Sequence, residues 1–326
     1  MPKRNISDIS QLIDDDLKRF NELFKQSLKS KVALVDLITR YILKQKGKKV
    51  RPLLVLLASK ISGGVTERSY RGAILVELLH TATLVHDDVV DNAETRRSFP
   101  SINAVWKNKV AVLMGDYLLA KGLMKAVDGS DYDFLKVITN TVKRMSEGEL
   151  LQTSKTRKLD NDQETYFRII SDKTASLLST CCEIGARAST NDESKIAAMR
   201  EYGENLGIAF QIRDDILDYV GTSTLLGKPL GADIKEKKIT LPLIYALKNS
   251  KADEAKKIIK NLKSGEKKID VNLIIEFTKN NGGIEYAEKI AKEYSNKAIQ
   301  NLSIFIESEY KSALQDLAVF VVERTK

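Results

Sequence analysis

Apolar residues recur every three or four positions along almost the whole chain, the spacing that places them on one face of an α-helix. No stretch alternates between apolar and polar residues in the manner of a half-buried strand. The pattern predicts helices at residues 5–29, 32–46, 51–62, 66–92, 110–129, 131–154, 162–188, 191–221, 241–249, 252–263, 269–280, 283–308 and 309–324. We therefore predict an all-α protein, in which helices bury their apolar faces against one another.

Proline and glycine agree with these helix boundaries. Pro52 and Pro242 fall in the first turn of a predicted helix, where the N–H group that proline lacks would have no partner. Gly129 marks the end of another helix. No segment rich in Ser, Gly or Pro divides the 326 residues, 43% of which are hydrophobic. We expect residues 1–326 to form a single domain with a large core.

The charge balance bears on the kind of partner. The formal charge is +9, from 53 Lys and Arg against 44 Asp and Glu. The lysines are spread along amphipathic helices such as residues 253–263, without interleaved aromatic side chains, so we expect no nucleic-acid binding. A net positive field would instead help to attract an anionic substrate.

The sequence also bears on cellular location. The first residues, MPKRNISDISQL, contain no apolar core of the signal-peptide type. No run of about 18 apolar residues could span a membrane. Cys181 and Cys182 are the only cysteines, and their adjacency would strain a disulfide between them. We expect them to pack as small hydrophobic residues in a protein of the reducing cytoplasm.

Two aspartate clusters of identical spacing stand at the polar ends of apolar helical patterns. They comprise Asp87, Asp88 and Asp91, and Asp214, Asp215 and Asp218. Residues three and four apart share a helix face, so each cluster projects carboxylates together. Such carboxylates repel one another unless a cation neutralises them. Oxygen ligands suit Mg²⁺, which usually binds through a few carboxylates and substrate phosphates. The two clusters therefore predict a phosphorylated substrate held between them.

The alternative is that both clusters are ordinary solvated helix faces. Apolar runs lead into each of them, at residues 73–85 and 206–212, which favours a site over a solvated face. Basic residues also gather nearby, at a predicted helix start, after the first cluster and in the loop from Gly221 to Thr240. These residues are Lys48 and Arg51, Arg96 and Arg97, and Lys228, Lys235, Lys237 and Lys238. Helix N-termini and arginines both suit phosphate binding. The alternatives are that the arginines only pair with nearby acidic residues and that the lysines belong to an ordinary basic loop.

These motifs together resemble the trans-polyprenyl diphosphate synthase family, of the long-chain type that makes octaprenyl, heptaprenyl or solanesyl diphosphate. The resemblance extends from about Gly47 to Leu243, and the last helix, ALQDLAVFVVERTK, is similar to family C-termini. It implies an isoprenoid-synthase-type bundle of antiparallel helices around a deep central cavity, usually as a homodimer. It also implies Mg²⁺-dependent elongation of an allylic diphosphate by isopentenyl diphosphate, with two or three metal ions per site.

The resemblance assigns roles residue by residue. Magnesium ions would be held by Asp87, Asp88, Asp91 and Asp214, with Asp215 and Asp218 in support. The allylic diphosphate would be bound by Arg96, Lys173, Lys228 and Lys238, with Lys237 as the alternative to the last. Isopentenyl diphosphate would be bound by Lys48, Arg51, His80 and Arg97. Thr174 and Gln211 would face the developing allylic cation.

Product length is read from the positions four and five residues before the first cluster, which are bulky in short-chain members of the family. Here they are Thr83 and Ala82, both small. We therefore favour a product of about six to ten isoprene units, growing along a helix that rises 1.5 Å per residue. Such a product serves quinone side chains, and its release would involve transient membrane contact. The alternatives are a short-chain geranylgeranyl or farnesyl diphosphate synthase, a terpene cyclase, and a non-catalytic partner subunit.

Overall fold

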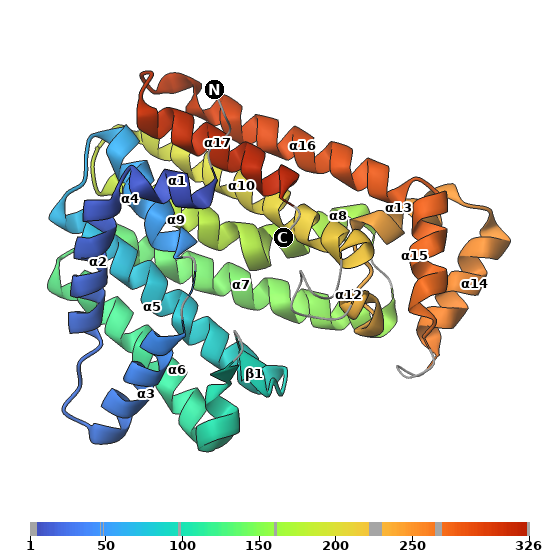
Figure 1. The fold of residues 1–326 in the computed structure, drawn as a ribbon, viewed down its shortest axis with the longest axis horizontal. Coiled ribbons are helices and arrows are strands. Elements are labelled where there is room, and N and C mark those ends of the chain that lie inside the picture. The colour runs from blue at the N-terminus through green and yellow to red at the C-terminus, as the bar shows by residue number, and fades with distance from the viewer. Residues whose placement is uncertain are drawn as a thin grey trace.

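The computed structural model describes residues 5–45, 47, 49–96, 99–159, 162–221, 230–264 and 269–324, and within them the predicted all-α architecture is confirmed (Figure 1). The first helices are α1 Ile6–Gln11, α2 Asp14–Ser27, α3 Ala33–Lys44, α4 Val50–Ser62, α5 Glu67–Val90, α6 Ile102–Asp128 and α7 Tyr132–Lys158. A continuous helical segment then comprises α8 Gln163–Ile170, the π-helical turn η1 Ser171–Ala175 and α9 Ser176–Arg187. The remaining helices are α10 Glu193–Val220, α12 Ala232–Lys235, α13 Leu241–Asn249, α14 Ala252–Lys263, α15 Val271–Asn280, α16 Gly283–Asn301, η3 Leu302–Ile304 and α17 Glu309–Glu323.

Two of the predicted helices differ from the structure. The single helix predicted over residues 5–29 is wrong, because the backbone at Ile13 leaves the helical region and α2 begins anew with three aspartates. Acidic residues stabilise a helix N-terminus, so this sequence favours a fresh start. Helix α6 begins at Ile102 rather than residue 110, since the side chain of Ser101 caps it. Lys107, with a positive φ, interrupts the first turns of α6. The apolar residues before and after it therefore do not follow one continuous helical spacing.

A short hairpin follows α5 and was not predicted. Its strands, β1 Thr95–Arg96 and β2 Phe99–Pro100, are antiparallel and too short to show an alternating pattern. Tyr41 of α3 holds the hairpin in place. Its hydroxyl donates to the Pro100 carbonyl at 2.7 Å, and its ring meets Phe99 and Trp106 edge-on. The hairpin thereby fixes the position of Arg96 beside the end of α5.

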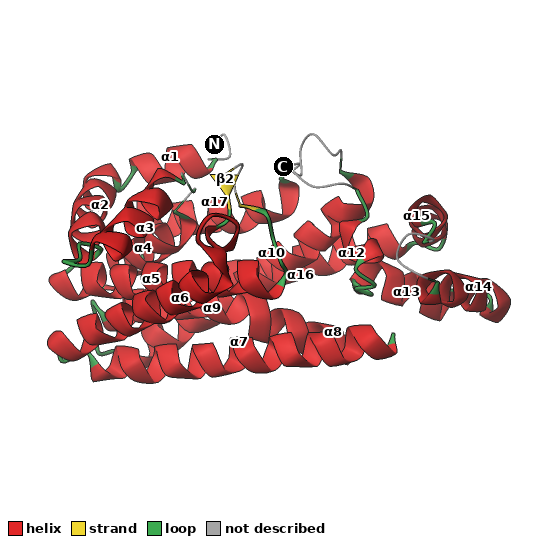
Figure 2. Cartoon of the chain, turned by 90° about the horizontal axis from the view of Figure 1, so that it is seen from below, coloured by secondary structure: helices red, strands yellow, loops and turns green. Residues whose placement is uncertain are grey.

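The core consists of two clusters of buried hydrophobic residues joined by α10. One cluster lies among α2, α4, α5, α6, α9 and α17, and the other among α8, α12, α13, α15 and α16. Tyr202, fully buried in α10, donates to the Leu314 carbonyl of α17 at 2.8 Å. Figure 2 shows α7 and α8 running along one face of the bundle, and Figure 1 shows α14 and α15 at the end opposite α2. The cavity described below lies between α7 and α10.

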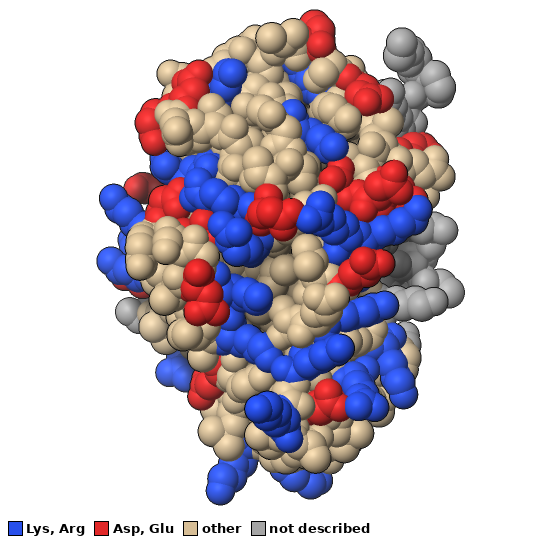
Figure 3. Space-filling model, turned by 90° about the vertical axis from the view of Figure 1, so that its left-hand side faces the viewer, with Lys and Arg blue, Asp and Glu red and all other residues tan. Residues whose placement is uncertain are grey.

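The surface mixes charges of both signs. At the end of the molecule that carries α2, basic and acidic side chains are intermingled (Figure 3). Arg68, for example, is ion-paired with Asp131 and Asp133 at 2.8 and 2.7 Å. Within the described ranges, no helix is both long and apolar enough to cross a membrane. The two cysteines are fully buried, which confirms that they pack as small hydrophobic residues.

Candidate active site

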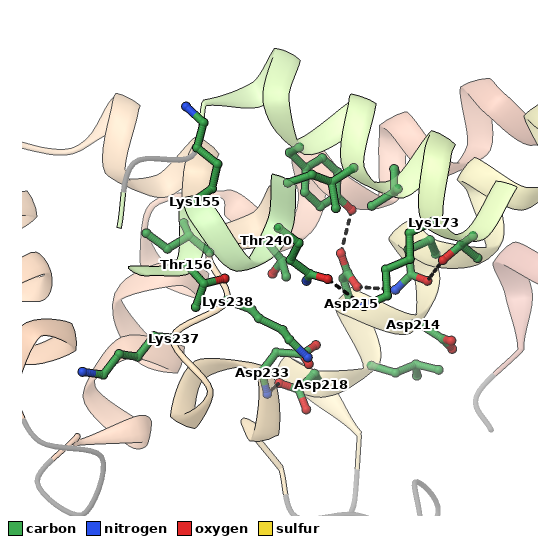
Figure 4. Close-up of a pocket in the computed structure, with 18 of the residues that line it drawn as sticks. Lys155, Thr156, Lys173, Asp214, Asp215, Asp218, Asp233, Lys237, Lys238 and Thr240 are labelled. Carbon is green, nitrogen blue, oxygen red and sulfur yellow. Dashed lines mark hydrogen bonds between the residues drawn. The ribbon is translucent and has the colours of Figure 1, made fainter. Parts of the chain in front are cut away.

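A cavity of about 420 Å³ lies between α7, the π-helical turn, α10 and α12 (Figure 4). The second aspartate cluster forms one wall of this cavity. Its charged lining comprises Lys155, Lys173, Asp214, Asp215, Asp218, Asp233, Lys237, Lys238 and Arg324. Figure 4 shows Lys238 extending toward Asp233 and Asp218, whereas Lys155 and Lys237 point away from the aspartates. This geometry favours Lys238 over Lys237 as the lysine that serves the site.

Asp214 is the most accessible member of the second cluster, with 42% of its side chain exposed. It forms an ion pair with Arg324, at the end of α17. The Arg324 guanidinium stacks on the ring of Phe210, 4.2 Å from the ring centroid. The backbone carbonyl of Arg324 accepts a hydrogen bond from Nε of Arg213 at 2.9 Å. The C-terminal helix thus contributes a cation to the site, a feature that the aspartate spacing could not reveal.

Asp215, by contrast, is buried and hydrogen-bonded within the protein. Tyr166 donates to it at 2.6 Å and Gln211 at 2.8 Å, while Thr174 donates to Gln211 at 2.9 Å. Burial, with a further contribution from Asp233, raises the pKa of Asp215 to about 8. In this structure Asp215 therefore orients Gln211 rather than presenting a free carboxylate to the cavity.

Asp218 anchors the segment that follows the second cluster. Its two carboxylate oxygens accept the backbone N–H groups of Ala232 and Asp233 at 3.1 Å each. This contact caps the short helix α12, whose dipole favours an anion there. It places Asp233, which the sequence analysis missed, at the cavity beside Lys238. Only its position after a long loop could have marked Asp233 in the sequence.

The first cluster divides between two sides of α5. Asp91 is the C-terminal cap of the helix, one residue beyond Val90. Asp87 is exposed, but partial burial of its carboxylate by the surrounding protein raises its pKa. The charge of Lys173 opposes this rise, whereas Glu149 and Asp91 add to it. Asp88 is 3% exposed and accepts from Arg96 through Nε at 2.8 Å. Asp88 thus holds Arg96, and Asp87 and Asp91 remain on the side of Lys173.

Two lysines stand between the clusters. Lys173 donates to Glu149 and Gln152 of α7 at 2.5 and 2.7 Å, two residues that the sequence analysis missed. Burial lowers the pKa of Lys238, but its hydrogen bond to Glu236 and the carboxylates of Asp233 and Asp91 outweigh burial, so the pKa is raised. Lys173 thus faces Asp87 and lines the cavity with Asp214, while Lys238 lies within the influence of Asp91 and Asp233.

A second cavity, of about 260 Å³, lies on the other side of α5. Its polar lining comprises Gln45, Gly47, Lys49, Glu77, His80, Thr81, Asp88 and Arg96. The structure therefore brings His80 together with Arg96 and the glycine before Lys48, as a second anion site requires. Lys49, which bonds to Asn21 and was not predicted, adds a partly buried cation whose pKa burial lowers.

Several predicted ligands are not among these lining residues. Lys48, Arg97 and Lys228 lie outside the described part of the chain. Arg51 does not line the 260 Å³ cavity and lies near the buried thiol of Cys181. Burial raises the pKa of that thiol to about 12, and Arg51 opposes the rise.

The aspartates of the first cavity and of the first cluster fit a hard divalent cation. Within the described ranges, no three His, Cys, Asp or Glu side chains converge closely enough to hold an ion by themselves. The donors are nevertheless carboxylates, and crowding of negative charge contributes to the raised pKa values of Asp87 and Asp215. A cation would relieve this excess charge. Substrate phosphates would complete its coordination, as is usual for Mg²⁺.

The two chain-length positions lie on different faces of α5. Thr83 is one turn below Asp87 on the same face, and its hydroxyl donates to the His80 carbonyl at 2.9 Å. Ala82 is 1% exposed. It lies one turn from His86, whose ring packs against Gly115 of α6. Ala82 therefore faces α6, whereas Thr83 lies on the face of α5 that carries Asp87.

The polyprenyl synthetase family model matches residues 32–276. The chain belongs to the polyprenyl synthetase family. It is 33% identical over 320 residues to octaprenyl diphosphate synthase of Haemophilus influenzae, covering 98% of this chain and 97% of that protein. It is 35% identical over 329 residues to geranylgeranyl diphosphate synthase of Saccharolobus solfataricus, covering 98% and 99%.

A solved family structure is equally similar. The polyprenyl synthase from Caulobacter crescentus, complexed with calcium and isoprenyl diphosphate, superposes with a TM-score of 0.90 at 32% identity over 100% of both chains. The predicted family and isoprenoid-synthase fold are confirmed. The protein is a polyprenyl diphosphate synthase, a prenyltransferase of isoprenoid biosynthesis. The family depends on metal ions, and its members make both long and short products.

Proposed function

We propose that this polyprenyl diphosphate synthase adds isopentenyl diphosphate repeatedly to an allylic diphosphate and makes a long all-trans product. The observation that carries the proposal is the face of α5 below Asp87. That face bears Thr83, Leu79, Val76 and Gly72 in successive turns. No Phe, Tyr or Trp stands on this face, although the His80 ring lies about two turns below Asp87, and the residue one turn below the aspartate, Thr83, is small.

The allylic diphosphate binds in the 420 Å³ cavity. When bound, two or three magnesium ions per site would supply Lewis-acid chemistry to the diphosphate. Asp87, Asp91 and Asp214 would hold them, with the buried Asp215 and Asp218 in support and Asp88 acting through Arg96. Lys173 and Lys238 bind the diphosphate oxygens and stabilise the charge that develops as it leaves, an electrostatic form of catalysis. Lys228 adds a third cation.

The developing allylic cation meets Thr174 and Gln211. Thr174 donates its hydroxyl proton to Gln211 at 2.9 Å, and Gln211 is fixed by Asp215. The lone pairs of the Thr174 oxygen are therefore left to face positive charge. The double bond of isopentenyl diphosphate, bound by Lys48, Arg51, His80 and Arg97, attacks the cation. A proton is then lost from the condensed product to the departing diphosphate.

Gly72 marks the depth to which α5 can guide the product. A Cβ atom there would lie 2.4 Å from Ile184 and 3.3 Å from the ring of Phe134. Fifteen residues separate Gly72 from Asp87, a rise of about 22 Å. This length supports a long product, while the close contact at Gly72 supports the runner-up, a short-chain synthase. The geranylgeranyl diphosphate synthase among the relatives favours the same alternative.

Incubation with isopentenyl and farnesyl diphosphates separates the remaining classes. A synthase consumes both substrates and yields a longer prenyl diphosphate. A terpene cyclase would release a hydrocarbon or alcohol without consuming isopentenyl diphosphate. A non-catalytic partner subunit would consume neither substrate. Only the first result agrees with the proposal.

We also propose a cytoplasmic homodimer in which each chain forms one domain, with the product serving a quinone side chain. Helix α6 supports the dimer, because it exposes an apolar stripe of Val105, Val112, Leu113, Met124 and Val127 at 40–58%. Stable interfaces bury such apolar surface. Sedimentation analysis of Leu113→Glu beside the wild type tests this proposal, since the substitution should yield monomers. Release of a long product would bring the enzyme into transient contact with a membrane.

A further inference from the structure

Lys173 and Thr174 lie in a π-helical turn, Ser171–Ala175, between α8 and α9. The N–H of Ser176 donates to the Ser171 carbonyl, five residues back instead of four. The turn therefore holds one more residue than an α-helical turn, and such turns occur frequently at functional sites. The directions of Lys173 and Thr174 depend on whether this extra residue is kept in the turn.

Two glycines bring neighbouring helices against the backbone of the turn. At Gly148 of α7, a Cβ atom would lie 3.0 Å from the Asp172 Cβ and 3.1 Å from the Lys173 nitrogen. At Gly207 of α10, it would lie 2.4 Å from the Ala175 Cα. The turn is therefore wedged between α7 and α10, and a side chain at either glycine would displace it.

One arginine ties the same turn to both helices. Arg144 of α7 donates from Nε to Asp172 at 2.8 Å, and from Nη2 to Ser171 and to Glu204 of α10 at 2.9 Å each. The Ser171 hydroxyl in turn donates to Glu204. The side chains of Arg144, Asp172 and Glu204 are 30%, 17% and 24% exposed, so the network is largely shielded from water. Charge-assisted, multidentate bonds of this kind fix geometry as well as adding energy.

The network and the substrate lie on different sides of the turn. Arg144, Ser171, Asp172 and Glu204 do not line the 420 Å³ cavity, whereas the next two residues along the chain do. The guanidinium of Arg144 thus binds Ser171 and Asp172, the two residues that directly precede Lys173. The residues that meet substrate are fixed from behind by residues that do not.

We propose that Arg144 and Glu204 are positioning residues, which hold the π-helical turn so that Lys173 meets the allylic diphosphate and Thr174 the developing cation. This inference rests on the proposed roles of those two residues. A misplacement of about 1 Å at a reacting group costs up to a hundredfold in rate. Loosening the turn should therefore lower kcat without removing any group that touches substrate.

The experiment compares two charge removals. The double variant Arg144→Met with Glu204→Leu removes both members of the ion pair together. The matched control is Arg68→Met, which breaks a similar fork to Asp131 and Asp133 at the start of α5. At temperatures well below both melting points, the double variant should lose about tenfold to a hundredfold in kcat and keep its KM for isopentenyl diphosphate. The control should melt earlier but keep the wild-type kcat. Equal kcat values in the double variant and the control would overturn the inference.

A further comparison separates this inference from the proposed function. Lys173→Ala alone should lower turnover of the allylic substrate, and normal turnover would mean that the role of Lys173 itself is wrong. If that variant is impaired while the double variant is not, only the positioning role fails. When Arg144→Met and Glu204→Leu are placed in a background of Lys173→Ala with Thr174→Val, most of their effect on kcat should disappear. An undiminished effect would show that Arg144 acts elsewhere.

Discussion

Replacing Thr83 with tyrosine should shorten the product without stopping catalysis. Thr83 lies four residues before Asp87, about 6 Å below it along α5. The face continues to Gly72, about 22 Å below Asp87, where Ile184 and Phe134 close it. A ring at Thr83 would therefore leave roughly a quarter of this length open, and forcing a chain past it costs about 1–3 kcal/mol or more.

Mass spectrometry of the products, wild type beside variant, measures this effect. Thr83→Tyr should consume short allylic primers and stop after few additions, while Thr83→Val, which loses only the hydroxyl bond to His80, should keep the wild-type length. Ala82→Phe should behave differently from the family expectation. Because Ala82 faces α6, a ring there should lower stability by about 1–3 kcal/mol, seen as an earlier melting temperature. Products of wild-type length from Thr83→Tyr would refute the path along this face.

Other predictions concern metal, substrates and pH. Asp87→Ala or Asp214→Ala should lower turnover by orders of magnitude, because the lost carboxylate binds the metal; Asp87→Ala should do so without lowering the melting temperature, because its removal relieves repulsion, and near-normal turnover would contradict the metal assignment. Lys48→Ala should raise mainly the KM for isopentenyl diphosphate and Lys228→Ala that for the allylic substrate, each by about tenfold to a hundredfold; steady-state kinetics showing the reverse would exchange the two sites. In metal-free protein, the pKa of Asp215 near 8 lies above the ordinary 3.8, so between these values the native state binds the extra proton and stability falls as pH rises. Asp215→Asn should remove this fall, and denaturant titrations that show the same slope for both proteins would exclude Asp215 as its source.

The helical pattern predicted the fold class correctly, because it depends on local periodicity, and the aspartates of the second cluster line the first cavity. Asp87 does face Lys173, and Asp91 lies near enough to add to the raised pKa of Asp87. The same spacing could not show that Asp88 turns to the opposite side and binds Arg96. That outcome depends on the hairpin after α5, whose two-residue strands leave no periodic signal.

Residues contributed by distant segments were the ones missed. Glu149 and Gln152 come from α7, Asp233 follows a long loop, and Arg324 reaches Asp214 from the far end of the chain. None of them belongs to a cluster in the sequence, so only packing reveals their role. The π-helical turn was likewise missed, since an extra residue within a continuous apolar pattern leaves the predicted helix over residues 162–188 unbroken.

The most direct test of the account is the length of the end product made by the wild-type protein. The purified enzyme would be incubated with Mg²⁺, farnesyl diphosphate and an excess of isopentenyl diphosphate, and the final products would be weighed by mass spectrometry. Because no Phe, Tyr or Trp stands on this face of α5 for about 22 Å below Asp87, we predict products that extend to about six isoprene units or beyond. Products that end at four units or fewer would contradict the long-chain assignment.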